Sequence, residues 1–201
     1  KKIELDEKYL FKISQEIQNN SSKNIELYPY AQITRNKIPD DIQNFYISHE
    51  GFIGVFEEEL KEDDYDDIEE KKIVREANEG WFGITDKYWM AALVPKSGEN
   101  FKSTFLYKDG FKANYILNKS TSVNPSSSNT NEVKLFVAAK EVETIDAYAA
   151  NQNIKKLDLV IDWGWFYFFT KPLFFIIDYL FKISGNFGIA IVLITIGIRL
   201  L

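Results

Sequence analysis

"KSTFLYKDGFKANYIL", residues 102–117, contains two runs of alternating apolar and polar residues joined by Asp109-Gly110. Alternation with a period of two is typical of a half-buried β-strand. An Asp-Gly pair between two such runs is a signal for a tight hairpin turn. This stretch therefore predicts two antiparallel strands, and it sets the pattern by which the rest of the chain is interpreted.

Similar short segments recur along the chain, separated by clusters of Asn, Ser, Gly and Pro. They lie at residues 8–17, 24–35, 44–56, 87–95 and 132–141. Short strands with turn signals between them favour antiparallel sheets over a parallel sheet with crossover helices. We expect a mainly β fold in which these strands form an antiparallel β-sandwich.

Three segments do not fit the strand pattern. Residues 120–131, "STSVNPSSSNTN", predict an exposed loop between strands. The acidic residues 57–72 lack the Gly and the spaced terminal Glu of a calcium loop, so a solvated loop or helix surface is favoured over a metal site. Residues 143–154 are rich in Ala and predict a short helix, and residues 155–165 are expected to be extended.

Charge and cysteine content exclude several functions. The formal charge of -6 lies within residues 1–157, because the ionisable side chains after residue 157 cancel. This argues against a nucleic acid or another polyanion as the partner of that part. The chain has no cysteine, which excludes cysteine zinc sites and thiol nucleophiles.

Residues 163–187 are unusually aromatic, with 11 of the 31 aromatic residues of the chain. Trp and Tyr at this density favour a membrane interface over a buried core. Lys171, Asp178 and Lys182 are spaced so that they share one helical face, and the other faces are apolar. We expect residues 166–184 to form a helix along a membrane surface, with Pro172 in its first turn and Gly185 at its end. A helix packed beneath the sandwich is the alternative.

The last segment is apolar from Phe187 to Ile198 and carries Arg199. Twelve residues are too few for a span, which needs ~20, so we expect a fragment whose apolar run continues after residue 201. Arg199 would lie ~18 Å along such a helix, past the middle of a hydrocarbon core of about 30 Å. At that depth it would face protein or water, since the cost is at least ~2.5 kcal/mol. Alternatively, it marks the cytoplasmic end of a short span and reaches the headgroups.

The order of motifs in residues 162–199 resembles the bacterial YidC membrane protein insertases. The matching motifs are Asp162-Trp163-Gly164-Trp165, Pro172-Leu173-Phe174, Gly185-Asn186-Phe187-Gly188 and the segment from Thr195 to Arg199. Residues 80–95, "GWFGITDKYWMAALVP", are similar to a Gly-Trp stretch of the same family. The first match is long and specific, and the second is weaker.

The resemblance implies a division of the chain into three parts. Residues 1–157 would be the C-terminal part of a periplasmic β-super-sandwich similar in shape to sugar mutarotases. Residues 158–185 would be a connector and interfacial amphipathic helix, and residues 186–201 the start of the second transmembrane helix, here truncated. The interface residues would be Trp163, Trp165, Lys171, Pro172, Phe174, Asp178 and Lys182, and the residues lining a hydrophilic substrate groove would be Arg199 and Thr195.

The function implied by the resemblance is insertion and folding of proteins in the bacterial inner membrane, with no cofactor. The partners would be nascent membrane proteins and the lipid bilayer, with Sec translocon subunits as further candidates. An enzyme of the mutarotase type would need histidines and a carboxylate, whereas His49 is the only histidine and is expected at the surface. The alternative is a membrane-anchored periplasmic binding or scaffold domain that docks to a translocon partner.

Overall fold

Strand pairing in the computed structural model is antiparallel in every pair among the described residues, which are 1–40, 42 and 48–200. The chain forms two units, Lys1–Ile161 and Asp162–Leu201. The first unit contains the strands, and the second contains the helices α3 and α4. The predicted mainly β, antiparallel sandwich followed by helices is confirmed.

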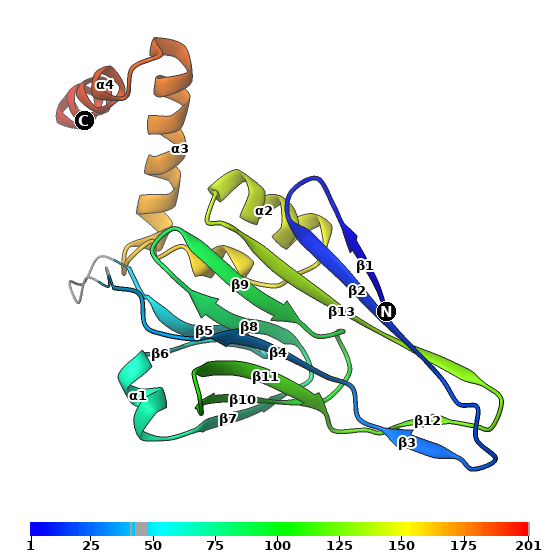
Figure 1. Ribbon diagram of the computed structural model, residues 1–201. Helices are drawn as coiled ribbons and strands as arrows, with labels where there is room; N and C mark the ends of the chain where they lie inside the picture. The colour runs from blue at the N-terminus through cyan, green and yellow to red at the C-terminus, as the bar shows by residue number, and fades with distance from the viewer. Residues whose placement is uncertain (41, 43–47, 201) are drawn as a thin grey trace. The chain divides into compact units, whose positions relative to one another are not determined.

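The larger sheet has seven strands in the order β1-β2-β13-β9-β8-β5-β6 (Figure 1). Their bounds are β1 Lys2–Leu5, β2 Leu10–Gln18, β13 Ser128–Ala139, β9 Trp89–Val94, β8 Gly80–Thr85, β5 Gly51–Phe56 and β6 Glu59–Asp63. The β2–β13 pair joins the two ends of the sandwich sequence, with Leu10 opposite Phe136 and Gln18 opposite Ser128. The larger sheet is therefore complete only when strands more than a hundred residues apart in the sequence have paired.

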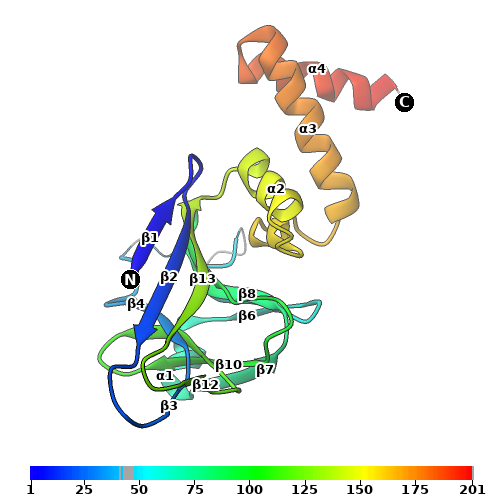
Figure 2. The ribbon, with the colours of Figure 1, turned by 90° about the vertical axis from the view of Figure 1, so that its right-hand side faces the viewer.

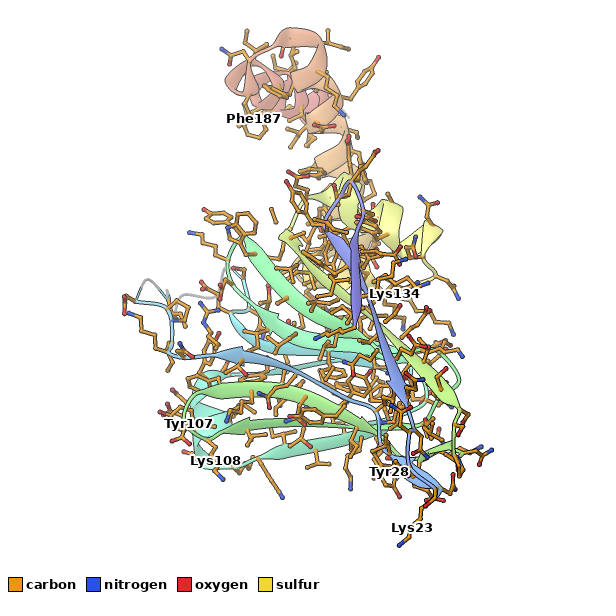
Figure 3. The ribbon with its side chains drawn as sticks, turned by 45° about the vertical axis from the view of Figure 1, so that its right-hand side comes forward. Lys23, Tyr28, Tyr107, Lys108, Lys134 and Phe187 are labelled. Carbon is orange, nitrogen blue, oxygen red and sulfur yellow. The ribbon has the colours of Figure 1, made fainter. Side chains whose placement is uncertain are left out.

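The smaller sheet has the order β4-β11-β10-β7. Its strands are β4 Tyr30–Arg35, β11 Phe111–Leu117, β10 Phe101–Tyr107 and β7 Ile73–Ala77. The predicted hairpin is confirmed, because Tyr107 pairs with Phe111 and the turn places Asp109 and Gly110 at φ 52° and 114°. Figure 3 shows Tyr107 and Lys108 at this turn. A separate ribbon of β3 Ile25–Leu27 and β12 Thr121–Val123 lies near Lys23 and Tyr28 in the same view.

A first hydrophobic core fills the space between the two sheets. Aromatic side chains dominate it: Phe52 on β5 lies 4.9 Å from Phe105 on β10, measured between ring centroids. Phe82 on β8 lies 6.1 Å from Tyr115 on β11 in an edge-to-face arrangement. Burial raises the pKa of Tyr115 to about 12, as expected for a phenol removed from water. These ring contacts hold the two sheets face to face.

A second core covers the opposite face of the larger sheet. It is formed under α2 (Val142–Asn151) and the short 3-10 helix η1 (Leu157–Val160), which lie against this face in Figure 2. Phe136 on β13 meets Tyr148 on α2 with ring centroids 5.2 Å apart. Trp81 on β8 is fully buried, and its indole N–H donates to the Lys155 carbonyl at 3.1 Å. That bond fixes the segment between α2 and η1 onto the sheet.

Strands β5 and β8 are therefore buried on both faces. Along β5, Phe52 and Phe56 face the first core, while Ile53 and Val55 face the second. This explains why "GFIGVF" is a continuous apolar run rather than an alternating one. On β8, a Cβ at Gly83 would lie 1.8 Å from the Ala91 carbonyl oxygen, so only glycine allows the strands to approach this closely.

A half-buried ion pair joins the two sheets at one edge. Arg75 on β7 contacts both carboxylate oxygens of Asp63, the last residue of β6, at 2.8 and 2.9 Å. The guanidinium also lies 5.5 Å from the ring centroids of Phe56 and Phe105. One hydrogen bond, from Arg75 Nη2 to Asp63 Oδ1, supports this ion pair, and the neighbouring rings shield it from water, so it is more directional than a surface contact.

The loop predicted at residues 120–131 is wrong in part. Thr121–Val123 forms β12, Ser128 already belongs to β13, and Val123 is only 1% exposed. The reason is a long-range polar contact, because the buried Asn19 side chain donates to the carbonyl oxygens of Lys23 and Val123, both at 2.8 Å. The polar residues of this segment are therefore held in place by hydrogen bonds from Asn19 and by strand pairing with β3, which an apolar sequence pattern does not reveal.

Other boundaries differ from the expectations. The predicted strand at 24–35 is split at Pro29, and the one at 44–56 begins at Gly51, while residues 43–47 lie outside the described residues. The acidic segment 57–72 includes β6 and α1 (Tyr65–Glu70), whose Tyr65 and Ile68 are buried. The predicted helix near 143–154 is confirmed as α2. The extended chain expected at 155–165 is wrong, because Leu157 and Val160 turn into the second core as η1.

We expect Trp81→Phe to destabilise the sandwich by about 3 kcal/mol, because the smaller ring leaves a cavity and the Lys155 carbonyl loses its donor. Urea unfolding of the detergent-solubilised chain, followed by β-sheet circular dichroism, measures the loss. Trp89→Phe is the matched control, since Trp89 is 60% exposed on the neighbouring strand β9. Equal midpoints for the two variants would contradict the role assigned to Trp81.

Candidate membrane-interface helix and groove arginine

The unit Asp162–Leu201 consists of a tight turn and two helices. The helices are α3 (Tyr167–Ser184) and α4 (Phe187–Leu200), which contact one another through the rings of Phe181 and Phe187 at 6.0 Å. No α3 residue is buried, and within the described part of α4 only Ala190 is. Both helices therefore expose broad apolar surfaces.

The Asp-Trp-Gly-Trp motif forms the turn that precedes α3. The Asp162 carboxylate accepts the Gly164 N–H at 2.8 Å, and Gly164 adopts φ 70°, a conformation that favours glycine. The Thr170 hydroxyl donates to the Trp163 carbonyl at 2.7 Å, which closes the turn onto the first turns of the helix. The motif thus folds Trp163 back onto α3 and leaves Trp165 91% exposed.

Trp163 is the centre of an aromatic cluster on α3. Its ring centroid lies 5.6 Å from that of Phe174 and 6.4 Å from that of Tyr167, both edge-to-face. The Lys171 ammonium lies 5.8 Å from the Trp163 ring and 5.6 Å from the Tyr167 ring. Aromatic rings combined with a lysine are the side chains that suit the boundary between lipid tails and water.

The charged residues of α3 follow the predicted spacing. Asp178 and Lys182 form an ion pair one turn apart at 2.7 Å, and Lys171 lies two turns before Asp178. The remaining surface is rich in exposed Phe, Ile and Tyr side chains. The structure thus forms the amphipathic helix that the sequence predicts, although its contact with a membrane stays a prediction.

Pro172 differs from the expectation. It is the sixth residue of α3 rather than a member of the first turn, because the helix begins at Tyr167. Inside a helix, proline removes one backbone hydrogen bond. The predicted start at residue 166 was one residue from the observed one, but residue 172 already lies in the second turn of such a helix, so the placement of the proline in the first turn was wrong.

The Gly-Asn-Phe-Gly motif separates α3 from α4. Gly185 ends α3 at φ 66°, with its N–H bonded to the Phe181 carbonyl, as predicted. The Asn186 side chain then accepts the Gly188 N–H at 2.9 Å and the Ile189 N–H at 3.3 Å, which caps the start of α4. One short motif therefore both ends one helix and begins the next.

Thr195 and Arg199 lie one turn apart on α4 and both are exposed. The Thr195 hydroxyl donates to the Ile191 carbonyl at 2.7 Å, so its oxygen keeps acceptor capacity toward a further group. Arg199 is the only charged residue of α4 and lies in its last turn. Among the described residues, neither α3 nor α4 combines the length and apolar character needed to cross a membrane.

From the sequence, Asp162 and Asn186 are named as motif residues, but the hydrogen bonds by which they shape these turns are not predicted, and Thr170 is not singled out. Asp162, Thr170 and Asn186 each satisfy a backbone group or close a loop. The sequence did contain signals for two of these roles. Asp162 lies two residues before Gly164, which is typical of a turn, and Asn186 lies directly before a helix, which is typical of an N-cap. His49 also differs from its expected place at the surface, because its side chain is 13% exposed and its Nε2 lies 2.9 Å from the Phe52 carbonyl oxygen.

The fold and the two helices define a β-sandwich domain joined to an amphipathic helix and an arginine-bearing apolar helix. Residues 1–176 match the family model of the YidC periplasmic domain, and the chain belongs to the YidC family. The suspected family resemblance is thereby confirmed.

Similar curated relatives are called membrane protein insertase YidC. The one from Pelagibacter ubique is 50% identical over 100% of this chain and 36% of its own length. Those from Brucella melitensis and Agrobacterium fabrum are 38% and 40% identical, each over 99% of this chain and 34% of their own length. The chain thus spans about a third of the length of these relatives.

We expect Gly164→Ala to loosen the turn before α3 by about 1 kcal/mol, because a side chain at positive φ is strained. Hydrogen exchange of residues 163–170 should become faster. Trp165→Phe should leave the exchange unchanged, since its ring is exposed and holds no part of the turn. Unchanged exchange in Gly164→Ala would show that the turn does not depend on this conformation.

Proposed function

We propose that this chain is part of a membrane protein insertase of the bacterial inner membrane. The single observation that supports this most is the position of Arg199, a lone charge on an apolar helix within a family whose curated relatives are called insertases. An arginine in apolar surroundings is costly and is normally retained for a function. The proposed function is not enzymatic and uses no cofactor.

Arg199 and Thr195 would line a hydrophilic groove. Their spacing of four residues places them on one face of α4, so together they offer a cation and a hydroxyl oxygen along the same strip. Polar groups of a nascent membrane protein lose water when they enter a bilayer, at a cost of several kcal/mol for each unsatisfied group. A hydrated, hydrogen-bonding wall lowers that cost. Further helices of the family would complete the groove, with α4 as the start of one membrane span.

The α3 helix would lie on the outer surface of the membrane. Its charged strip of Lys171, Asp178 and Lys182 would face water, while Phe174 and the Trp163 cluster would enter the headgroup region. Trp165, 91% exposed, would anchor the turn in the same layer. Residues 158–185 would thus connect the sandwich to the bilayer surface.

The sandwich of residues 1–157 would lie in the periplasm as a scaffold or docking domain. Its net negative charge disfavours direct attraction to anionic lipid and to nucleic acid. A protein partner such as a Sec translocon subunit is a candidate for its surface. The alternative function is a membrane-anchored binding domain that docks to such a partner. It would be favoured if insertion does not need Arg199.

We expect spin labels placed along α3 in the full-length protein in liposomes to show an accessibility period near 3.6 residues. Positions 171, 178 and 182 should be accessible to a water-soluble relaxation agent, and positions 169, 176 and 180, on the opposite face of the helix, to oxygen dissolved in lipid. Positions 102 and 104, which both lie on the outward face of β10, serve as a control and should be accessible to the water-soluble agent alone. Uniform protection along α3 would favour a helix packed within protein and would contradict the interfacial placement.

We expect Arg199→Ala in the full-length protein to slow the insertion of a single-span substrate roughly tenfold, equivalent to about 1.4 kcal/mol. Arg199→Lys should keep most of the wild-type rate, because a positive charge keeps the wall hydrated. Lys102→Ala, which removes an exposed charge on β10, is the control for charge loss alone.

Two results would overturn the groove assignment. Wild-type rates for Arg199→Ala, with cysteine labelling that places position 199 in the headgroup region, would show a snorkelling residue at the end of a span. Equal loss of insertion in the Lys and Ala variants at normal protein levels would show that the charge itself is not what the site requires.

A further inference from the structure

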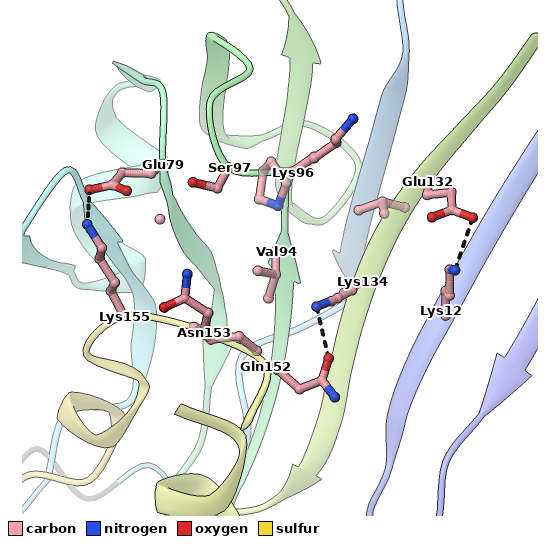
Figure 4. Close-up of a pocket in the computed structure, with 14 residues that line it drawn as sticks. Lys12, Glu79, Val94, Lys96, Ser97, Glu132, Lys134, Gln152, Asn153 and Lys155 are labelled. Atoms are coloured by element: carbon pink, nitrogen blue, oxygen red, sulfur yellow. Dashed lines mark hydrogen bonds and ion pairs between the residues drawn. The ribbon is translucent and has the colours of Figure 1, made fainter. Parts of the chain in front are cut away.

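A cavity of about 260 Å³ lies within the sandwich unit, between the end of β9, the middle of β13 and the segment that follows α2 (Figure 4). It exists because β9 stops early. The last β9–β13 pair is Val94 with Lys134, and the next residue is Pro95, which has no N–H to continue the ladder. The Gly98 N–H then bonds to the Asn78 carbonyl, so the chain turns away from β13.

The segment after α2 forms the other wall. Gln152 ends the helix, and Asn153 and Lys156 adopt left-handed conformations at φ 52° and 55°. The Trp81 indole holds the Lys155 carbonyl, as described above. The walls are therefore fixed by the second core rather than by contacts across the cavity.

The lining combines apolar and cationic groups. Val94, Pro95 and Ile154 supply apolar surface, and Ile154 is only 2% exposed. Four lysines and two glutamates line the rest, a formal excess of two positive charges in a chain whose net charge is -6. The four lysines are Lys12, Lys96, Lys134 and Lys155, and the glutamates are Glu79 and Glu132.

Ion pairing accounts for three of these lysines. Lys96 lies 3.5 Å from Glu99, which is outside the cavity lining, and the other two pair within the lining. Lys12 lies 3.1 Å from Glu132, and Lys155 lies 2.7 Å from Glu79. The hydrogen bond from Lys12 lowers the pKa of Glu132, and the hydrogen bond to Glu79 raises the pKa of Lys155, so each bond favours the charged form of that side chain. Glu132 and Glu79 are therefore both paired with lysines other than Lys134.

Lys134 is half-buried and donates to the neutral Gln152 amide oxygen at 2.9 Å. Figure 4 shows its side chain directed from β13 toward Gln152. Its direct partner across the β2–β13 pair is Lys12, another cation. Glu132 already offsets the charge of Lys12, whereas the Gln152 amide that accepts from Lys134 is neutral. A bound anion would therefore supply Lys134 with a charged partner.

We propose that this cavity binds a small organic anion with an apolar body, whose acid group contacts Lys134 and whose body contacts Val94, Pro95 and Ile154. The volume lies just below the range of roughly 300 to 1,000 Å³ that is usual for small-molecule sites, which favours a compact ligand. A hydrogen-bonded ammonium beside an apolar wall fits a carboxylate on a short hydrocarbon or aromatic group. This site is independent of Arg199 and of the proposed insertion function.

The probe for the test is 3-phenylpropionate, titrated by ligand-observed NMR against the chain in nanodiscs of zwitterionic lipid, with protein-free nanodiscs subtracted. We expect saturable binding that Lys134→Gln weakens about tenfold, the effect of losing one hydrogen bond to a charged group. Lys134→Arg should restore most of the affinity. Lys108→Gln, at the exposed β10–β11 turn, is the matched control and should bind as the wild type does.

Two further probes separate the contributions. The cation 3-phenylpropylammonium keeps the apolar body and should not compete, and acetate keeps the acid group and should bind much more weakly. The proposal is overturned if the wild-type chain shows no saturable binding, if the cation binds as tightly as the anion, or if Lys134→Gln binds with wild-type affinity. Should Lys134→Gln lower the melting temperature, Lys12→Gln tests the same cationic pair from the opposite strand.

Discussion

The burial of β5 and β8 on both faces is the constraint on which the sandwich depends. A strand with apolar side chains on both sides needs one covering layer on each. Here the smaller sheet packs against Phe52 of β5 and Phe82 of β8 on one face, and α2 with η1 packs over Trp81 of β8 on the other. The chain beyond the last strand is therefore part of the domain core, and the Trp81–Lys155 bond fixes where that chain can run.

The helical unit is shaped by turn chemistry instead of by a core. Asp162 and Gly164 fold the aromatic residues back onto α3, and Gly185 with Asn186 divides two apolar helices that a continuous pattern would otherwise merge. Each of these residues satisfies a backbone group or adopts a positive φ. Apolar side chains on α3 and α4 are thereby left exposed, available to a lipid or protein environment, while the geometry of the helices is set locally.

Local signals explain what the sequence could predict. The Asp109-Gly110 hairpin, α2, and the end of α3 at Gly185 each depend on a few neighbouring residues, and each was predicted correctly. β12 was missed because its order comes from Asn19, about a hundred residues earlier in the chain. β8 was not recognised as a separate strand, since its two-sided burial produces no alternation. The cavity beside Lys134 could not be predicted, because its walls come from segments that only the fold brings together.

Both the number and the arrangement of charges distinguish the two apolar helices. In α3 the charges recur at seven and four residues, so one strip can stay in water while the rest of the helix enters the interface. In α4 a single charge stands at the far end of an apolar run, where no continuous polar strip exists to face water. Such a helix tolerates its arginine only where water, a headgroup or another protein segment meets that one position. The two patterns therefore fit the proposed placement of α3 along a membrane surface and the proposed polar site at Arg199.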